Sequence, residues 1–205
     1  MQRTLPNGSI VHDHEQGTPE WFAARAGKMT ASNATAIGNC GKGLETYIEE
    51  LMAEYFSSAD KERFSTKDTE RGNELEPIAR QIYEFENDVV VEQVGFIEYN
   101  PYVGASPDGL VGEVGGTEIK CLIDPKYFKL MLHGDAKIDS DHKWQCQMNL
   151  LVTGREWWDL IYYCPNYKQS TCVFRIYPDQ EMFDKLKKGF AIGEEMINNI
   201  KARIQ

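Results

Sequence analysis

Hydrophobic and polar positions along the chain follow two different periods, which predicts helices near the two ends of the sequence and strands in its middle. A short helix is expected from Pro19 to about Ala26, because Thr18 is a good capping residue and proline suits the first helical position. Apolar residues then recur at helical spacing in two longer segments, 44–56 and 68–86. The segment between them, 57–66, is polar and charged and is expected to be a linker.

From residue 89 onward, β-branched residues and a shorter alternation predict a group of strands. We expect these strands at about 89–91, 94–99, 104–111 and 117–123. Pro107-Asp108-Gly109 and Gly115-Gly116 are expected to form bends or turns between them. The rest of the chain predicts two helices, two strands and a final amphipathic helix, at about 125–132, 141–153, 157–164, 171–177 and 182–200.

This order of elements predicts an α/β (α+β) fold in which helices flank one central mixed β-sheet. The 205 residues suit one sizeable core, and no repeat or low-complexity linker divides them, so a single domain over residues 1–205 is expected. No segment approaches the ~18 consecutive apolar residues of a membrane span, and the amino-terminal residues do not form a signal peptide. We therefore expect a cytosolic protein without a membrane partner.

The formal net charge of −10 argues against a protein that coats nucleic acid indiscriminately, because that binding depends on many Lys and Arg contacts with phosphate. A local basic groove remains compatible with such a charge. Lys126, Lys129, Lys137 and Lys143 are candidates to line a DNA path, and a solvated surface is an equally good interpretation of them. The charge therefore lowers the expectation of nucleic-acid binding without removing it.

Candidate chemistry lies within the predicted strands, where Asp108 is followed ten residues later by Glu118-Ile119-Lys120. Side chains two apart on a strand project from one face, so Glu118 and Lys120 are expected to point together while Ile119 enters the core. If the two strands pair, Asp108 and Glu118 converge on one hard cation, with the backbone carbonyl of Ile119 as a further oxygen ligand. Mg²⁺ is the expected ion, with Mn²⁺ as a substitute.

Hydrolysis of a phosphodiester needs a nucleophilic water and stabilisation of the charge that develops in the transition state. In this interpretation Asp108 and Glu118 hold the ion, and Lys120 orients the water and offsets negative charge. Taken singly, Pro-Asp-Gly is more often just a turn, and Glu-x-Lys on a strand is more often a solvated face. Only their combination points to a metal-dependent nuclease.

Several sequence blocks resemble the exonucleases related to that of phage lambda, YqaJ-like viral recombinase exonucleases within the PD-(D/E)xK nuclease superfamily. The blocks occur in family order and are R-A-G-K-M-T-A-S at 25–32, R-G-x-x-x-E-x-x-A-R at 71–80, S-P-D-G-L at 106–110, E-I-K-C at 118–121 and Q-C-Q-M at 145–148. The resemblance implies a PD-(D/E)xK restriction-endonuclease-like core. It also implies that Asp108, Glu118 and the Ile119 carbonyl bind metal, and that Lys120 and Gln145 contact or orient the attacking water.

The same resemblance implies that Glu76 supports the metal site, and that Arg25, Ser32 and Ser106 bind the 5′-phosphate of a DNA end. A forked, charged Arg donor with hydroxyls around it suits a phosphate. The implied activity is Mg²⁺-dependent 5′-to-3′ digestion of double-stranded DNA from 5′-phosphorylated ends, which leaves 3′ single-stranded overhangs for phage-type recombination. A ring-shaped homotrimer and a single-strand annealing protein as partner, in the bacterial host of a phage or prophage, are implied as well.

Two alternatives to the exonuclease stay open. One is an endonuclease of the restriction or repair type with the same PD-(D/E)xK fold. The other belongs to a different class and is a catalytically idle protein that binds DNA ends. The intact set of Asp108, Glu118 and Lys120 favours an enzyme over this second alternative.

Overall fold

The computed structural model describes residues 2–57 and 67–204, except for the side chains of residues 67–70. The predicted linker, 57–66, therefore lies almost entirely outside the described residues. The helices within the described ranges are α1 (Pro19–Arg25), α2 (Ala34–Asn39), α3 (Lys42–Phe56), α4 (Lys67–Asn87), α5 (Asp124–His133), α6 (Ser140–Thr153) and α7 (Gln180–Ile204), with 3-10 turns η1 (Ala31–Asn33) and η2 (Gly134–Lys137). None of these helices combines the length and the apolar character that crossing a bilayer requires.

The strands form two mixed sheets, which confirms the predicted α+β class but corrects the expectation of one central sheet. The first sheet has the order β1 (Gln2–Thr4), β2 (Ile10–His12), β5 (Phe96–Asn100), β6 (Val103–Ala105) and β3 (Met29–Thr30). The second sheet has the order β10 (Thr171–Ile176), β9 (Trp157–Tyr163), β8 (Gly115–Cys121), β7 (Gly109–Val111) and β4 (Val91–Glu92). In each sheet one pairing, β3 with β6 and β8 with β9, is parallel.

The predicted strand 104–111 is wrong as one element, because the chain leaves the first sheet after β6 and enters the second at β7. The break falls at Ser106-Pro107-Asp108, where proline has no N–H to offer a sheet ladder. The side chain of Gln16 holds this bend, since its Nε2 donates to the carbonyls of Val94 (3.0 Å) and Pro107 (3.1 Å). Ser106 and Asp108 therefore lie at the junction of the two sheets.

The turn expected at Gly115-Gly116 lies elsewhere, at residues 112–114, and both glycines belong to β8. A Cβ atom at either position would come within 2.1–2.3 Å of the indole rings of Trp157 and Trp158 on β9. The glycines therefore serve close packing of tryptophans on the neighbouring strand. The predicted strand 89–91 is also displaced, to Val91–Glu92, because α4 continues to Asn87 and Asp88 takes a positive φ of 52°.

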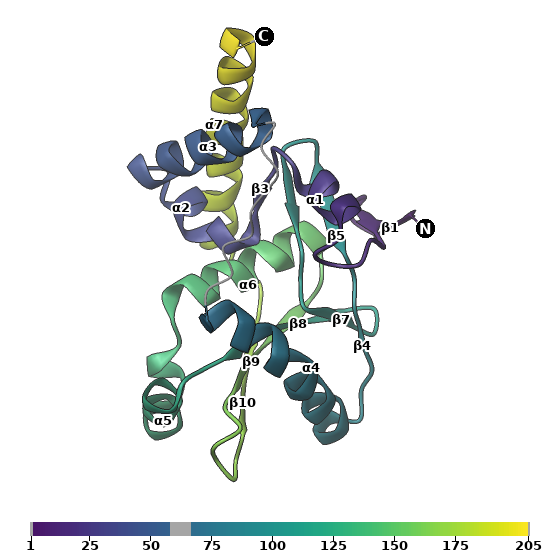
Figure 1. Ribbon diagram of the computed structural model, residues 1–205, viewed down its shortest axis with the longest axis vertical. Coiled ribbons are helices and arrows are strands. Elements are labelled where there is room, and N and C mark those ends of the chain that lie inside the picture. Colours follow the sequence, from purple (N-terminus) through teal and green to yellow (C-terminus); the bar gives the residue numbers. More distant parts are fainter. Residues whose placement is uncertain (1, 58–66, 205) are drawn as a thin grey trace.

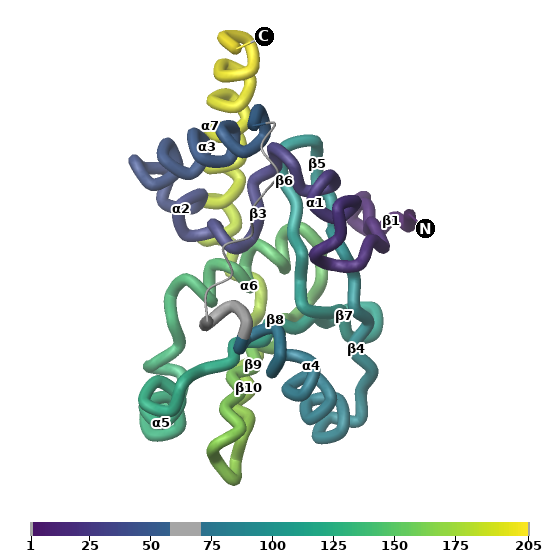
Figure 2. Tube along the Cα trace, in the orientation of Figure 1, coloured from purple at the N-terminus to yellow at the C-terminus, as the bar shows by residue number. Residues whose placement is uncertain are grey.

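Helix α6 lies between the two ends of the molecule, and all of its residues from Cys146 to Thr153 are buried. Figure 1 shows α2, α3 and α7 gathered at one end, and α5 with the β9–β10 hairpin at the other. Helix α4 packs on the second sheet, where Ala79 and Tyr83 join a small core with Ile119 and Ile161. The tube in Figure 2 traces how the amino-terminal strands run beside β5.

Candidate active site

The β7–β8 hairpin carries the predicted acidic residues and is held in a fixed register. Gly109 pairs with Thr117, and Val111 pairs with Gly115. The buried guanidinium of Arg155 closes its turn, since Nη1 donates to the carbonyls of Val111 (3.3 Å), Gly112 (2.9 Å) and Gly115 (2.6 Å). This register places Asp108, directly before β7, opposite Glu118 in the middle of β8.

Asp108, Glu118 and Lys120 meet at the end of this hairpin, as the sequence predicts. The Ile119 backbone N–H donates to Oδ2 of Asp108 at 2.6 Å, which ties the carboxylate directly to β8. Lys120 Nζ lies 2.8 Å from Oε1 of Glu118, and the Glu118 side chain is only 2% exposed. Ile119 itself is buried in the core beneath α4.

Two amide side chains of α6 complete the surroundings of Glu118. Gln145 donates from Nε2 to Glu118 Oε1 at 2.6 Å and accepts from Lys120 Nζ at 3.0 Å. Asn149, one helical turn later, donates from Nδ2 to Glu118 Oε2 at 3.1 Å. The structure thus brings Gln145 to the predicted acid–lysine pair and adds Asn149, which the sequence interpretation missed.

The pKa values in this cluster reveal a surplus of negative charge. Burial raises the pKa of Asp108 well above its usual value, and the charges of Glu118 and Glu76 raise it further. Burial also raises the pKa of Glu76, although Arg80 opposes this effect. Burial by itself lowers the pKa of Lys120, but Glu118 and Asp108 outweigh it and hold the pKa above its usual value. Lys120 therefore stays charged beside acids that repel one another.

The donor set fits a hard divalent cation. Asp108, Glu118 and Glu76 supply carboxylate oxygens, which Mg²⁺ prefers as ligands. Their negative charges repel one another, and a bound cation would reduce that repulsion. Within residues 2–57 and 67–204, no group of three or more His, Cys, Asp or Glu side chains is arranged to hold a metal alone. An ion held by Asp108 and Glu118 would take its other ligands from backbone oxygen, water and substrate phosphate, as Mg²⁺ commonly does.

The predicted phosphate-binding residues Arg25 and Ser106 are in direct contact. Arg25 Nη1 donates to Ser106 Oγ at 2.7 Å, and Trp21 Nε1 approaches the same oxygen at 3.1 Å. The Arg25 guanidinium lies 4.2 Å from the centre of the Trp21 ring. Burial lowers the pKa of Arg25, while Tyr47 and Glu54 oppose that effect. Ser106 stands two residues before Asp108, so the Arg25–Ser106 pair adjoins the acidic cluster along the chain.

Ser32, the third predicted phosphate ligand, is exposed in η1 and is joined to the Arg25–Ser106 pair only indirectly. Its Oγ lies 3.2 Å from Thr30 Oγ1, and the Thr30 N–H donates to the Tyr47 hydroxyl at 2.9 Å. The same hydroxyl interacts electrostatically with Arg25. Tyr47 was missed in the sequence because its place among the apolar positions of α3 looks like that of a core residue.

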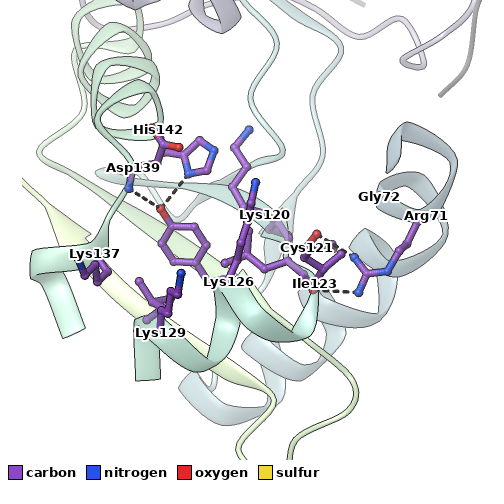
Figure 3. A pocket seen from close by; sticks show the side chains of 14 residues that line it. Arg71, Gly72, Lys120, Cys121, Ile123, Lys126, Lys129, Lys137, Asp139 and His142 are labelled. Atoms are coloured by element: carbon purple, nitrogen blue, oxygen red, sulfur yellow. Dashed lines mark hydrogen bonds between the residues drawn. The ribbon is translucent and has the colours of Figure 1, made fainter. Parts of the chain in front are cut away.

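A cavity of about 480 Å³ opens beside Lys120 and is strongly basic. Figure 3 shows Lys126, Lys129 and Lys137 around it, with Arg71 at its edge. Arg71 is already occupied, since its guanidinium donates to the carbonyls of Cys121 (3.0 Å) and Leu122 (2.9 Å). The three lysines are exposed and form no ion pair with any described residue. Lys143, the fourth candidate, does not line the cavity.

Residues 20–156 match the model of the YqaJ-like viral recombinase domain. An alkaline exonuclease, LHK-Exo from Laribacter hongkongensis, has 31% sequence identity with the chain, and the match covers 91% of this chain and 98% of that one with a TM-score of 0.78. The complex of LHK-Exo with dAMP gives the same identity and coverage and a TM-score of 0.80. No curated protein has a significantly similar sequence.

A phage related exonuclease from Haemophilus somnus 129PT shares the fold, with a TM-score of 0.71 over 87% of this chain and 96% of that one, at 15% identity. Fold and sequence together thus define a nuclease of the exonuclease class. More particularly, the chain belongs to the YqaJ-like viral recombinase family, because the family match spans more than half of its length. The resemblance to the phage lambda exonuclease family is therefore confirmed.

Proposed function

We propose that this nuclease is a Mg²⁺-dependent 5′-to-3′ exonuclease of double-stranded DNA that starts at 5′-phosphorylated ends. The observation that carries the proposal is the short bridge Ser106-Pro107-Asp108, which joins the hydrogen-bonded pair Arg25–Ser106 to the acidic cluster. A terminal phosphate held by Arg25 would place the next phosphodiester of the same strand toward Asp108 and Glu118. If that terminal phosphate is a 5′-phosphate, as the family resemblance implies, attack would proceed from the 5′ end.

The chain's own residues can perform the steps of a PD-(D/E)xK-type hydrolysis. Asp108, Glu118 and the Ile119 carbonyl would hold a divalent ion, which supplies an activated water and neutralises phosphate charge when bound. The protonated Lys120 stabilises charge on the phosphate, and its bond to Gln145 fixes where its ammonium points. Glu76 would support the same site from α4, and Ser32 would complete the phosphate pocket.

The basic cavity beside Lys120 supports DNA as the substrate. Lys126, Lys129 and Lys137 concentrate positive charge next to the acidic cluster in a protein whose net charge is −10. Local positive charge of this kind attracts and guides a phosphate backbone. We therefore assign these lysines to the DNA path, in preference to a merely solvated surface.

We base the biological setting of the proposal on what the family resemblance implies. The product would be a duplex with 3′ single-stranded overhangs, which a single-strand annealing protein uses in phage-type recombination within the bacterial cytosol. The homotrimer ring implied by the family would keep the enzyme on its DNA. Measuring the molecular mass in solution tests that assembly, and a monomeric mass at working concentrations would contradict it.

Digestion of end-labelled linear duplexes tests the activity, with either 5′-phosphate or 5′-hydroxyl ends, in Mg²⁺ or in EDTA. We expect nucleotide release from the 5′-phosphorylated end in Mg²⁺ only, a weaker end preference in Arg25→Ala, and loss of activity in Lys120→Ala. Lys185→Ala is the matched control, because Lys185 is an exposed lysine that pairs with Glu181 on α7. Full activity in Lys120→Ala would overturn the mechanism.

Two further substrates separate the alternatives. Cutting of covalently closed circles would favour an endonuclease of the restriction or repair type. Binding of duplex ends without any digestion in Mg²⁺ or Mn²⁺ would favour an idle end-binding protein. The exonuclease predicts digestion of linear DNA and no reaction with closed circles.

A further inference from the structure

Asn149 is a fully buried polar residue in the middle of α6, with 0% exposure. It lies four residues after Gln145, so both amides project from the same face of the helix toward β8. Each of them binds one oxygen of Glu118, with Gln145 on Oε1 and Asn149 on Oε2. The Glu118 carboxylate therefore accepts hydrogen bonds from two amides of one helix, which lie a single turn apart.

The two oxygens of Glu118 are not used equally. Oε1 accepts from both Gln145 Nε2 (2.6 Å) and Lys120 Nζ (2.8 Å), which occupies its two lone-pair positions. Oε2 accepts a single hydrogen bond among the described residues, the one from Asn149. Oε2 is thus the oxygen with an acceptor position left to offer to another partner.

Asn149 makes this contact at a cost to its own hydrogen bonding. Its Oδ1 is buried and has no partner among the described residues. Only the amide nitrogen can face a carboxylate, so the orientation that serves Glu118 leaves the carbonyl oxygen unsatisfied. A buried acceptor without a partner lowers stability, so the hydrogen bond to Glu118 Oε2 is made at a local cost. The asparagine therefore serves the Glu118 carboxylate and not its own hydrogen bonding.

We propose that Asn149 is a positioning residue that orients Glu118 so that Oε2 faces the divalent ion. This inference rests on the metal-dependent function proposed above and adds a residue outside the sequence motifs. Partners that orient a metal ligand typically change metal affinity by about 10- to 100-fold when they are removed. Loss of the Asn149 amide should therefore weaken metal binding while the fold persists.

The test compares Asn149→Leu with Gln147→Leu by titration with Mn²⁺, followed by electron paramagnetic resonance, and by thermal unfolding in EDTA. Gln147 is a matched control, because it is a buried amide on the same helix that binds the Tyr177 carbonyl (2.8 Å) and the Asp179 N–H (2.9 Å) instead. For Asn149→Leu we expect a protein that still unfolds cooperatively in EDTA, with a Kd for Mn²⁺ about tenfold higher or more. For Gln147→Leu we expect an unchanged Kd for Mn²⁺ and a lower melting temperature.

Asn149→Ala provides a second variant in case leucine does not fit, because alanine removes the same donor and favours the helix. Unchanged Mn²⁺ affinity in either folded Asn149 variant would overturn the positioning role. Equal weakening in Gln147→Leu would also overturn it, since the effect would then be a general one of α6. A wild-type protein that binds no Mn²⁺ would instead overturn the proposed metal site itself.

Discussion

Two neighbouring strands each bury a carboxylate, Glu118 on β8 and Asp159 on β9. The charged groups and hydrogen-bond donors around these two acids differ. Asp159 is 2% exposed, and Arg175 donates to both of its oxygens at 2.8 Å. The Tyr83 hydroxyl adds a third donor at 2.7 Å, and the guanidinium stacks 3.8 Å from the centre of the Trp157 ring. Asp159 is thus neutralised and fully bonded within the protein.

Glu118 is equally buried, yet its surroundings do not balance in charge. It shares Lys120 with Asp108, whose pKa is raised by burial and by the negative charges of Glu118 and Glu76. The register pairs Glu118 with Leu160, so its side chain points to the face opposite Asp159. A buried acid whose charge is neutralised by a paired cation contributes to the fold. A buried acid with further negative charges beside it is instead suited to bind a cation or a substrate.

The largest effect that separates the two acids is expected from Glu118→Gln. Glutamine keeps the size of the side chain and removes one of the repelling charges, although its amide cannot accept all the hydrogen bonds that Lys120, Gln145 and Asn149 donate to the carboxylate. The rate of nucleotide release from 5′-phosphorylated duplex in Mg²⁺ should fall by about a thousandfold, because one of the groups that stabilise the transition state is lost. Near wild-type rates would place the reacting centre elsewhere.

Arg175→Leu is expected to have the next largest effect, on stability alone. It leaves Asp159 buried with only the Tyr83 hydroxyl as partner, which should cost about 3 kcal/mol in urea denaturation. Asp159→Asn should cost less, because the remaining Arg175 side chain is 43% exposed and can reach water. If Asp159→Asn were the more damaging change, burial would not be the reason that this acid needs its partner.

The acidic cluster should also make stability depend on pH. Because the pKa of Asp108 is raised in the folded state, the folded protein binds this proton more tightly than the unfolded chain. In EDTA, stability should therefore fall as pH rises from about 4, the unfolded carboxyl pKa, through the raised pKa, and the loss is complete above it.

Melting temperatures in EDTA, measured across this range for wild type and Asp108→Asn, test the sign. The advantage of Asp108→Asn over wild type should grow with pH, and added Mg²⁺ should reduce it by stabilising the wild type. A difference that shrinks as pH rises would mean that the Asp108 carboxylate is stabilised, not strained, by its neighbours.

The sequence could predict the pair Glu118 and Lys120 because both lie on one strand, where a period of two decides which side chains meet. Asp108 could be added because only a short hairpin separates it from Glu118. Glu76 and Gln145 come from helices far along the chain, so spacing alone could not place them. They were found only through the resemblance to a family.

Tyr47 and Asn149 could not be found in either way. Each stands among apolar positions of a helix, and its polar atom reaches the site only after that helix has packed. The division into two sheets was missed for a related reason. Proline explains why a strand ends near Pro107, but the direction of the chain after the bend depends on distant contacts such as that of Gln16.

The smallest effect is expected from Tyr83→Phe, which removes one of the donors to Asp159 and leaves Arg175 in place. A hydrogen bond to a charged group contributes about 1.5–3 kcal/mol, and the remaining fork from Arg175 should keep the loss at the low end of that range. Urea denaturation measures it. Tyr83 lies on α4 two turns after Glu76, so the rate of DNA digestion is the informative second measurement.

An unchanged rate in Tyr83→Phe would mean that the two buried acids act independently, although the same helix packs against both strands. A rate that falls together with stability would mean that the Asp159 cluster holds α4 where Glu76 can support the metal site. We expect independence, because Ala79 and Leu75 also anchor α4 in the small core beneath it. The balanced acid would then stabilise the sheet, while the unbalanced one remains free to carry the chemistry.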